Sequence, residues 1–140
     1  MTAPRFVPDP VGLSAQYYAF CAAGELRFQR CDGCGAWRHP PRHRCGACGS
    51  DRWEWAASSG RGRVFSWTVT HKAFDPAFAE RLPYAVLVVE LDEGPRVVAN
   101  LVEADPAVLR LDLPVEVVFE PLADGIALTH FRPRGGAEPG

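Results

Sequence analysis

Two pairs of cysteines in the first half of the sequence constrain its fold more than any other feature. Cys31, Cys34, Cys45 and Cys48 form a C-x2-C-x10-C-x2-C pattern. A two-residue gap lets both thiolates of one turn face a single ion, and two such turns complete a tetrahedron. The sequence therefore predicts a four-cysteine structural zinc site in a small ribbon.

The same spacing is compatible with three alternatives: a thiol-redox pair, an iron site of the rubredoxin type, and a cysteine set that has lost its metal. Four thiolates close the coordination sphere, whereas a catalytic zinc keeps an open position for water, so we expect the metal to stabilise the fold. His39 and His43 lie between the pairs and could substitute as ligands. Cys21 lies outside the pattern on an apolar helical face, which favours a small core residue over a nucleophile.

The residues on either side of the cysteines predict a mainly β chain with one helix. An apolar pattern with helical spacing ends at Gly24 and predicts an amphipathic helix over residues 11–23; its members are Leu13, Tyr17, Phe20 and Cys21. The four expected parts are an N-terminal arm and helix (1–24), a rubredoxin-like zinc ribbon (25–57), a C-terminal five-stranded OB-fold barrel (58–133) and a disordered tail (134–140).

Apolar runs separated by turn residues predict the strands of the barrel. Tyr84–Leu91 is almost entirely apolar, which is typical of a strand buried on both faces. Asp105-Pro106 combines an N-cap with a proline at the first helical position and predicts a helical turn over 106–110; Asp75-Pro76 repeats the signal. Five strands with a short helix between the third and fourth indicate an OB-fold. The expected strands are 64–71, 84–91, 96–102, 115–120 and 126–131.

Charge divides unevenly between the two halves of the chain. Residues 1–63 hold nine arginines against five acidic residues, whereas residues 64–140 hold six basic and twelve acidic residues. Arg38, Arg42 and Arg61 belong to the basic stretch, and planar guanidinium groups suit phosphates, including those of coenzyme A. Ion pairs with the acidic barrel or with an acidic partner are the alternative.

Leu13, Tyr17 and Phe20 add apolar surface beyond what a small barrel needs to bury. Aromatic side chains together with arginine are typical of protein–protein interfaces, so we expect this helix to form a partner-binding surface. The alternative is that the helix packs on the ribbon.

The sequence disfavours several classes of function. No stretch approaches the ~18–20 apolar residues of a membrane span, and the first residues lack the pattern of a secretory signal, so we expect a cytoplasmic protein without membrane contact. No serine stands in a G-x-S-x-G setting and no Walker-type phosphate loop occurs, so no active site is predicted. His71 and His130 are expected to have polar surface or core roles.

Several motifs, taken in order, resemble the zinc-ribbon/OB-fold acyl-CoA-associated proteins, a family long catalogued as a domain of unknown function. The resemblance covers about residues 13–133 and is specific as a set, whereas a single cysteine pair would be weak. The motifs are Gly24–Cys31, Pro40–Arg42, Ser59–Gly62, Pro83–Tyr84, Leu91–Gly94 and Pro114–Val117.

This resemblance implies a non-catalytic accessory subunit. Members of the family pair with thiolase-superfamily enzymes, namely thiolases, ketoacyl-CoA synthases and the lipid-transfer-protein-like aldolases that cut steroid side chains. Some work with enoyl-CoA hydratases of the hot-dog fold. The partner would supply the catalytic residues, while the small subunit supports its folding or helps to route acyl-CoA.

The rival hypothesis is a protein that binds single-stranded nucleic acid, because OB-folds and zinc ribbons both occur in such proteins. The net charge of -2 and the acidic second half disfavour it, since affinity for a nucleic-acid backbone comes from neutralised phosphates.

Overall fold

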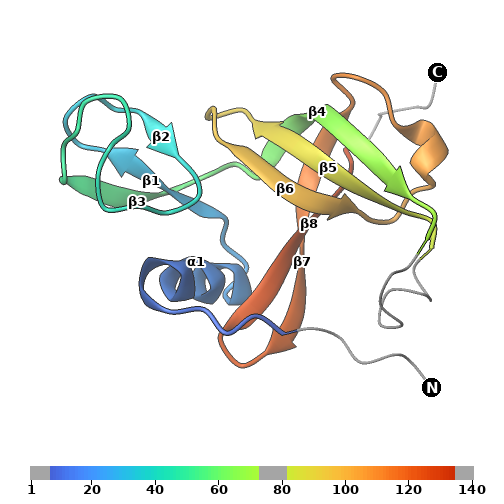
Figure 1. The fold of residues 1–140 in the computed structure, drawn as a ribbon, viewed down its shortest axis with the longest axis horizontal. Helices are drawn as coiled ribbons and strands as arrows, with labels where there is room; N and C mark the ends of the chain where they lie inside the picture. Colours follow the sequence, from blue (N-terminus) through green and yellow to red (C-terminus); the bar gives the residue numbers. More distant parts are fainter. Residues whose placement is uncertain (1–6, 73–81, 135–140) are drawn as a thin grey trace.

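The computed structural model describes residues 7–72 and 82–134, which form one α-helix, a three-stranded ribbon and a closed five-stranded barrel (Figure 1). This confirms the predicted fold class, a mainly β chain with an N-terminal helix and an OB-like barrel. Helix α1 spans Gly12–Ala22 and the short 3-10 helix η2 spans Pro106–Val108. The strands are β1 (Arg27–Cys31), β2 (Trp37–Arg38), β3 (Trp53–Ala57), β4 (Arg61–Thr70), β5 (Tyr84–Leu91), β6 (Arg96–Leu101), β7 (Pro114–Ala123) and β8 (Ile126–Pro133).

The ribbon sheet has the order β2-β1-β3, and both of its ladders are antiparallel. In the central strand β1, neighbouring residues Phe28 and Gln29 point to opposite faces, yet both are fully buried. Phe28 packs against the ring of Tyr17 in α1, with ring centroids 6.3 Å apart. Gln29 Oε1 accepts a hydrogen bond of 2.8 Å from the backbone N–H of Arg42. The helix therefore covers one face of β1, and the loop after β2 covers the other.

The barrel has the strand order β4-β5-β6-β8-β7 and closes through the pairing of β4 with β7. Every pairing is antiparallel except that of β6 with β8, which sets Asn100 opposite His130. The predicted hairpin of residues 84–91 with 96–102 is confirmed by the β5–β6 ladder. Fully buried residues of the barrel are Val64, Leu87, Val89, Leu113, Val115 and Phe131.

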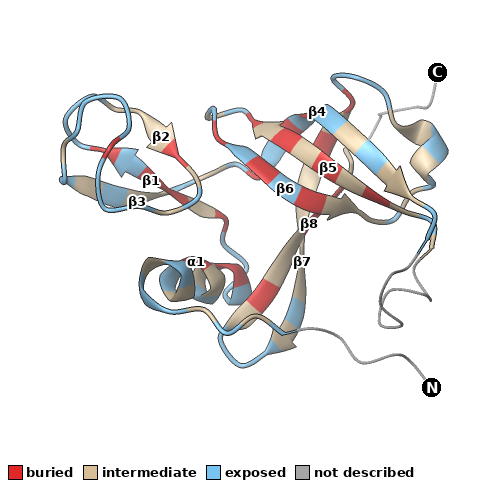
Figure 2. Cartoon of the chain, viewed as in Figure 1, coloured by how far each residue is buried: buried red, intermediate tan, exposed pale blue. Residues whose placement is uncertain are grey.

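Strand β5 departs from the expectation of burial on both faces. Every second residue, from Ala85 to Leu91, is buried, while the residues between them are half-buried (Figure 2). A barrel strand alternates between the interior and the outside, so its outward residues can be apolar without belonging to the core. The continuous apolar run therefore reflects a valine-rich outer surface as well as a core face.

Helix α1 begins one residue later and ends one residue earlier than the predicted span of 11–23. Tyr17 and Cys21 are four residues apart and lie on the same face of the helix. The Tyr17 hydroxyl is 3.4 Å and the Cys21 Sγ 3.5 Å from the Thr129 Oγ1 of β8. Because Tyr17 also contacts the ribbon, α1 connects the two sheets (Figure 1).

The predicted helical turn at 106–110 is present as η2, and the Asp105 carboxylate accepts the 2.8 Å N-cap hydrogen bond from the Ala107 N–H. The turn predicted at Asp75-Pro76 and most of the tail predicted at 134–140 lie outside the described residues. In the described ranges, no helix has both the length and the hydropathy that crossing a membrane requires.

The barrel closes where β4 passes between β5 and β7, and Gly62 lies at this crossing. It stands opposite Leu91 on one side and Val115 on the other. A Cβ atom added to Gly62 would collide with the Glu90 carbonyl oxygen and lie 3.0 Å from the Leu91 Cα. Since both contacts are with backbone, a side chain here would force the strands apart.

We expect Gly62→Ala to lower the free energy of unfolding by about 2 kcal/mol, because overpacking against backbone cannot be relieved by a rotamer change. Thermal denaturation of the full chain should show a fall in Tm of about 6 °C. Gly46→Ala is the matched control, since its Cβ would meet nothing closer than 3.7 Å. Equal melting of both variants and the wild type would contradict the close approach.

Candidate functional site

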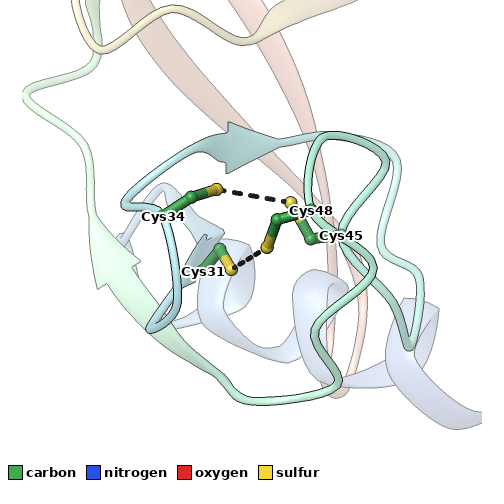
Figure 3. Close-up of side chains that lie close together, drawn as sticks. All are labelled: Cys31, Cys34, Cys45 and Cys48. Carbon is green, nitrogen blue, oxygen red and sulfur yellow. Dashed lines mark hydrogen bonds between the residues drawn. The ribbon is translucent and has the colours of Figure 1, made fainter.

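The two cysteine turns bring four sulfur atoms into one cluster in the ribbon (Figure 3). All four atoms lie within 4.8 Å of one another, with Cys31 Sγ 3.6 Å from Cys48 Sγ and Cys34 Sγ 3.6 Å from Cys45 Sγ. A disulfide would need a separation of about 2.0 Å. Sulfur ligands around a tetrahedral ion with 2.3 Å bonds stand about 3.8 Å apart. The cluster therefore fits a single metal ion with four cysteine ligands.

Both cysteine turns have the same backbone geometry. The Gly33 N–H donates to Cys31 Sγ and the Ala47 N–H donates to Cys45 Sγ, each over 3.3 Å. The residue after each pair has a φ of +77°, a left-handed conformation that glycine adopts without steric cost. These residues are Gly35 and Gly49, which is why a glycine follows the second cysteine of each pair.

Backbone donors also favour the ionised sulfur that binds metals. The N–H groups of Cys48 and Ala47 point at Cys45 and lower the pKa of its thiol to about 6. A hydrogen bond from the backbone of Cys34 likewise lowers the pKa of Cys31. Because the thiolate is the metal ligand, these donors favour metal binding at Cys31 and Cys45. At Cys48, a hydrogen bond from the Ser50 backbone lowers the pKa, but contacts with the thiols of Cys31 and Cys34 outweigh it and raise the pKa to about 11.

The two loop histidines do not belong to the cluster of described residues. The His39 ring lies 4.9 Å from the Tyr17 ring and 5.3 Å from the Phe28 ring, and burial lowers its pKa to about 4. His43 is exposed. Cys21 is 1% exposed and belongs to the core, as predicted.

Arg38 lies in a place that does not suit its expected contact with a phosphate of coenzyme A. It is only 5% exposed, and its Nε donates to Gln29 Oε1 over 2.9 Å. Its Nη2 donates to the Arg42 carbonyl oxygen over 2.7 Å. The β1–β2 register sets Arg38 opposite Gln29. The guanidinium group therefore holds the loop that contains Arg42 by hydrogen bonds from inside the ribbon.

The three helix residues expected at a partner interface have different positions. Tyr17 is 7% exposed and packs between the ribbon and β8, which argues against direct contact with a partner. Leu13 and Phe20 are half-buried. Phe20 lies on another side of the helix, in edge contact with Trp55 of β3 at 5.4 Å between ring centroids.

Phe20 belongs to a larger surface, which we call the aromatic–arginine patch. The Arg27 guanidinium lies 5.2 Å from the centre of the Phe20 ring, and the Trp53 and Trp55 rings meet edge to face at 5.3 Å. The Trp55 Nε1 donates to Gln16 Oε1 over 2.8 Å. The patch consists of Gln16, Phe20, Arg27, Trp53 and Trp55.

Arg42 and Arg61 are both exposed, and neither forms an ion pair with a described residue. The alternative of pairing with the acidic barrel applies to Arg63, whose Nη2 lies 2.7 Å from Glu90 Oε1. Arg42 and Arg61 are therefore available to an external anion.

A histidine–carboxylate pair in the barrel was not predicted from the sequence. His130 Nε2 lies 2.8 Å from Glu120 Oε1. The two strands are joined at Asp124-Gly125, and their register makes residues 120 and 130 diagonal neighbours. The turn signal was visible in the sequence, but the register that follows from it was not.

The fold and the cysteine cluster define a class of protein in which a metal-binding ribbon precedes an OB-like barrel. Two family models match these parts in the same order. The rubredoxin-like zinc ribbon domain of ChsH2 matches residues 19–54, and its C-terminal OB-fold domain matches residues 55–120. The chain belongs to the ChsH2 family, and the resemblance noted in the sequence is confirmed.

Curated relatives and a solved structure agree with this assignment. The chain is 40% identical over 128 residues to a probable enoyl-CoA hydratase alpha subunit of Thermomonospora curvata, covering 90% of this chain but 40% of that protein. It is 33% identical over 91 residues, 64% of each protein, to a DUF35 domain-containing scaffold protein of Methanocaldococcus jannaschii. A chain of the Ltp2-ChsH2(DUF35) aldolase matches with a TM-score of 0.80 and 36% identity, over 90% of this chain and 98% of that one.

We expect Cys34→Ser and Cys48→Ser each to reduce bound metal from about one equivalent to near zero. Both should also lower Tm, because the free energy of metal binding is free energy of folding here. Elemental mass spectrometry for zinc and iron, together with thermal denaturation, measures both effects. Cys21→Ala is the control and should keep its metal, since Cys21 is no ligand. Full metal content and unchanged melting in both serine variants would refute a four-cysteine site.

Proposed function

We propose that this chain is a non-catalytic accessory subunit that binds and supports a thiolase-superfamily acyl-CoA enzyme. The proposal rests mainly on the similarity to the Ltp2-ChsH2(DUF35) aldolase, because the chain covers 98% of the matching chain at 36% identity. The partner would be a thiolase, a ketoacyl-CoA synthase or a lipid-transfer-protein-like aldolase. Similarity to the hydratase alpha subunit makes a hot-dog-fold enoyl-CoA hydratase a second partner class. We expect the hetero-oligomer to be cytoplasmic.

The resident metal in this proposal is zinc in a structural role. Four thiolates are soft ligands, and a tetrahedral set of them selects zinc or iron. Zinc has no redox chemistry, and four protein ligands leave no position for water or substrate. The cysteine cluster would then hold the ribbon in the shape that presents the aromatic–arginine patch.

The aromatic–arginine patch is the proposed partner interface. Tryptophan and arginine are among the residue types that most often dominate binding energy at protein interfaces. The Phe20 and Trp55 rings are already held by contacts with each other and with Arg27 and Gln16. Pre-ordered side chains lose less conformational entropy on binding, which favours affinity.

The first test is purification of the tagged full chain from its own host, with mass spectrometry of the proteins that co-elute stoichiometrically. We expect a thiolase-superfamily enzyme, and Phe20→Ala should weaken its binding about tenfold with little change in Tm. Tyr17→Ala is the contrasting variant. It should lower the free energy of unfolding by about 3 kcal/mol, because it empties a buried site.

The outcomes separate the hypotheses. Recovery of RNA or single-stranded DNA alone, with binding that falls steeply as salt rises, would favour the rival function. Co-elution of the enzyme with unchanged affinity in Phe20→Ala would move the interface away from the patch. Co-elution of no acyl-CoA enzyme would contradict the accessory role.

Arg42 and Arg61 are the proposed contacts for the phosphates of acyl-CoA. In the purified complex, the double variant Arg42→Gln/Arg61→Gln should bind coenzyme A about tenfold more weakly, because charge-assisted hydrogen bonds to phosphate are lost. Affinity for pantetheine, which has no phosphate, should not change. Arg110→Gln is the control, since Arg110 is exposed outside the basic stretch. Calorimetric titration measures all these affinities, and equal loss for both ligands would refute the assignment.

A further inference from the structure

The four residues of the cysteine cluster differ in exposure, and the difference follows their order within each pair (Figure 3). The first cysteine of each pair is buried: Cys31 is 2% and Cys45 is 6% exposed. The second cysteine of each pair, Cys34 or Cys48, is exposed. A reagent in solution therefore meets the second cysteine of a pair before the first.

The chemistry of the cluster makes this difference important. Metals bind the thiolate form of cysteine, and the thiolate is also the form that reacts with oxidants. In the metal-loaded cluster, exposure and local hydrogen bonds then decide which sulfur reacts first. The buried sulfurs of Cys31 and Cys45 each accept an N–H hydrogen bond over 3.3 Å, which withdraws charge from them and lowers their nucleophilicity.

Gly33 distinguishes the two exposed cysteines. A Cβ atom added to Gly33 would lie 3.5 Å from the sulfur of Cys31 and 3.5 Å from the sulfur of Cys48. Gly33 is itself exposed, and glycine places no methyl group at this position. One flank of the Cys48 sulfur is therefore open to small molecules.

The second turn has a methyl group at the equivalent position. Gly33 precedes Cys34 as Ala47 precedes Cys48, and the N–H groups of both residues donate to the first sulfur of their own turn. The sulfurs also pair across the turns in the same way, at 3.6 Å for Cys31 with Cys48 and 3.6 Å for Cys34 with Cys45. By this equivalence we expect the Ala47 methyl group to shield Cys34, which leaves Cys48 as the more reactive sulfur.

We propose that Cys48 is the oxidation site of a peroxide-sensitive switch in the ribbon and that Cys31 completes the reaction by forming a disulfide with it. The oxidant is hydrogen peroxide. Cys31 is the resolving residue because its sulfur lies 3.6 Å from that of Cys48. The redox chemistry takes place on sulfur, so it is compatible with a structural metal that has none of its own.

The reaction has two steps. The Cys48 thiolate attacks one oxygen of hydrogen peroxide, the O–O bond breaks, and hydroxide leaves behind a sulfenic acid. The Cys31 thiolate then attacks the sulfenic sulfur, the S–S bond forms, and a second hydroxide leaves. Two protons from solvent convert both hydroxides to water, so two thiolates lose two electrons and one peroxide gains them.

The disulfide leaves only Cys34 and Cys45 as ligands, which is half of the tetrahedral set, so the metal is released. Cys31 stands opposite Trp53 in the β1–β3 ladder. Release would therefore loosen the ribbon next to the aromatic–arginine patch. A loss of affinity for an enzyme partner would follow only if the proposed function is correct, whereas oxidation and metal release do not depend on it.

The test uses the zinc-loaded full chain and hydrogen peroxide. With dimedone present to trap sulfenic acid, peptide mass spectrometry should find the tag first on Cys48. Without dimedone, we expect a Cys31–Cys48 disulfide and one zinc ion released for each peroxide consumed, measured with a chromogenic chelator. Cys21 is 1% exposed and should remain a thiol.

Three variants that keep all four ligands test the open flank. Gly33→Ala should slow zinc release several-fold, because the new methyl group lies beside the Cys48 sulfur. It also lies 3.3 Å from the Ser50 Cβ, so zinc content and Tm are measured first. Gly46→Ala is the matched control, since its Cβ would meet the Arg42 guanidinium at 3.7 Å and should leave the rate unchanged. Ala47→Gly should allow dimedone to tag Cys34 as well.

Each result decides the proposal. A first tag on Cys48, with slower release in Gly33→Ala and an unchanged rate in Gly46→Ala, would support it. A first tag on Cys34, or equal tagging of Cys34 and Cys48 in the wild type, would overturn the assignment. Zinc that stays bound while peroxide is consumed would overturn the switch. If Gly33→Ala binds no zinc, the tags in the wild type and in Ala47→Gly decide. None of these measurements involves an acyl-CoA enzyme, so failure here leaves the accessory role untouched.

Discussion

The convergence of four cysteine sulfurs is the constraint on which the ribbon and its surroundings depend. The ribbon contributes few large apolar side chains to the core, chiefly Leu26 and Phe28, and its strand β2 has only two residues. So small a sheet buries too little surface to be stable by hydrophobic burial alone. A metal that joins Cys31 and Cys34 to Cys45 and Cys48 ties the two ends of the intervening loop together. Within that segment, Arg38 lies opposite Gln29 of β1. Gln29 Oε1 accepts hydrogen bonds from both the Arg38 side chain and the Arg42 backbone.

Helix α1 links the ribbon to the barrel through side-chain contacts on both sides. Tyr17 contacts the Phe28 ring on the ribbon side and the Thr129 hydroxyl on the barrel side. Burial raises the pKa of the Tyr17 hydroxyl above its ordinary value of 10.0, so the group keeps its proton well into the alkaline range. On another side of the same helix, Phe20 contacts Trp55 and contributes to the aromatic–arginine patch. One helix thus divides its residues between the core and a surface suited to recognition.

The local signals in the sequence predicted most of the fold. Cysteine spacing indicated the metal-binding turns, and the N-cap at Asp105 indicated η2. Strand boundaries agreed within about three residues because turn residues mark them. The features that the sequence did not predict depend on packing between distant residues. Arginine is usually a surface residue, and only the register with Gln29 places Arg38 inside the ribbon. The helical period identified the apolar side of α1, but nothing local said that Tyr17 would face β8. The pairing of His130 with Glu120 likewise required the β7–β8 register.

Buried polar atoms without partners belong to side chains that other contacts already hold. Gln29 Nε2, Arg38 Nη1, His39 Nδ1 and His130 Nδ1 all lack hydrogen-bond partners among the described residues. In the ribbon, the side chains of Gln29 and Arg38 already make several hydrogen bonds through their other atoms, so the leftover donors are by-products of a network that holds the loop. In the barrel, the His130 ring is held by the contact of its Nε2 with Glu120 Oε1. The unpaired atoms of Gln29 and Arg38 are therefore consequences of the network that holds the loop, and the Glu120 contact fixes the His130 ring in the same way on the barrel wall.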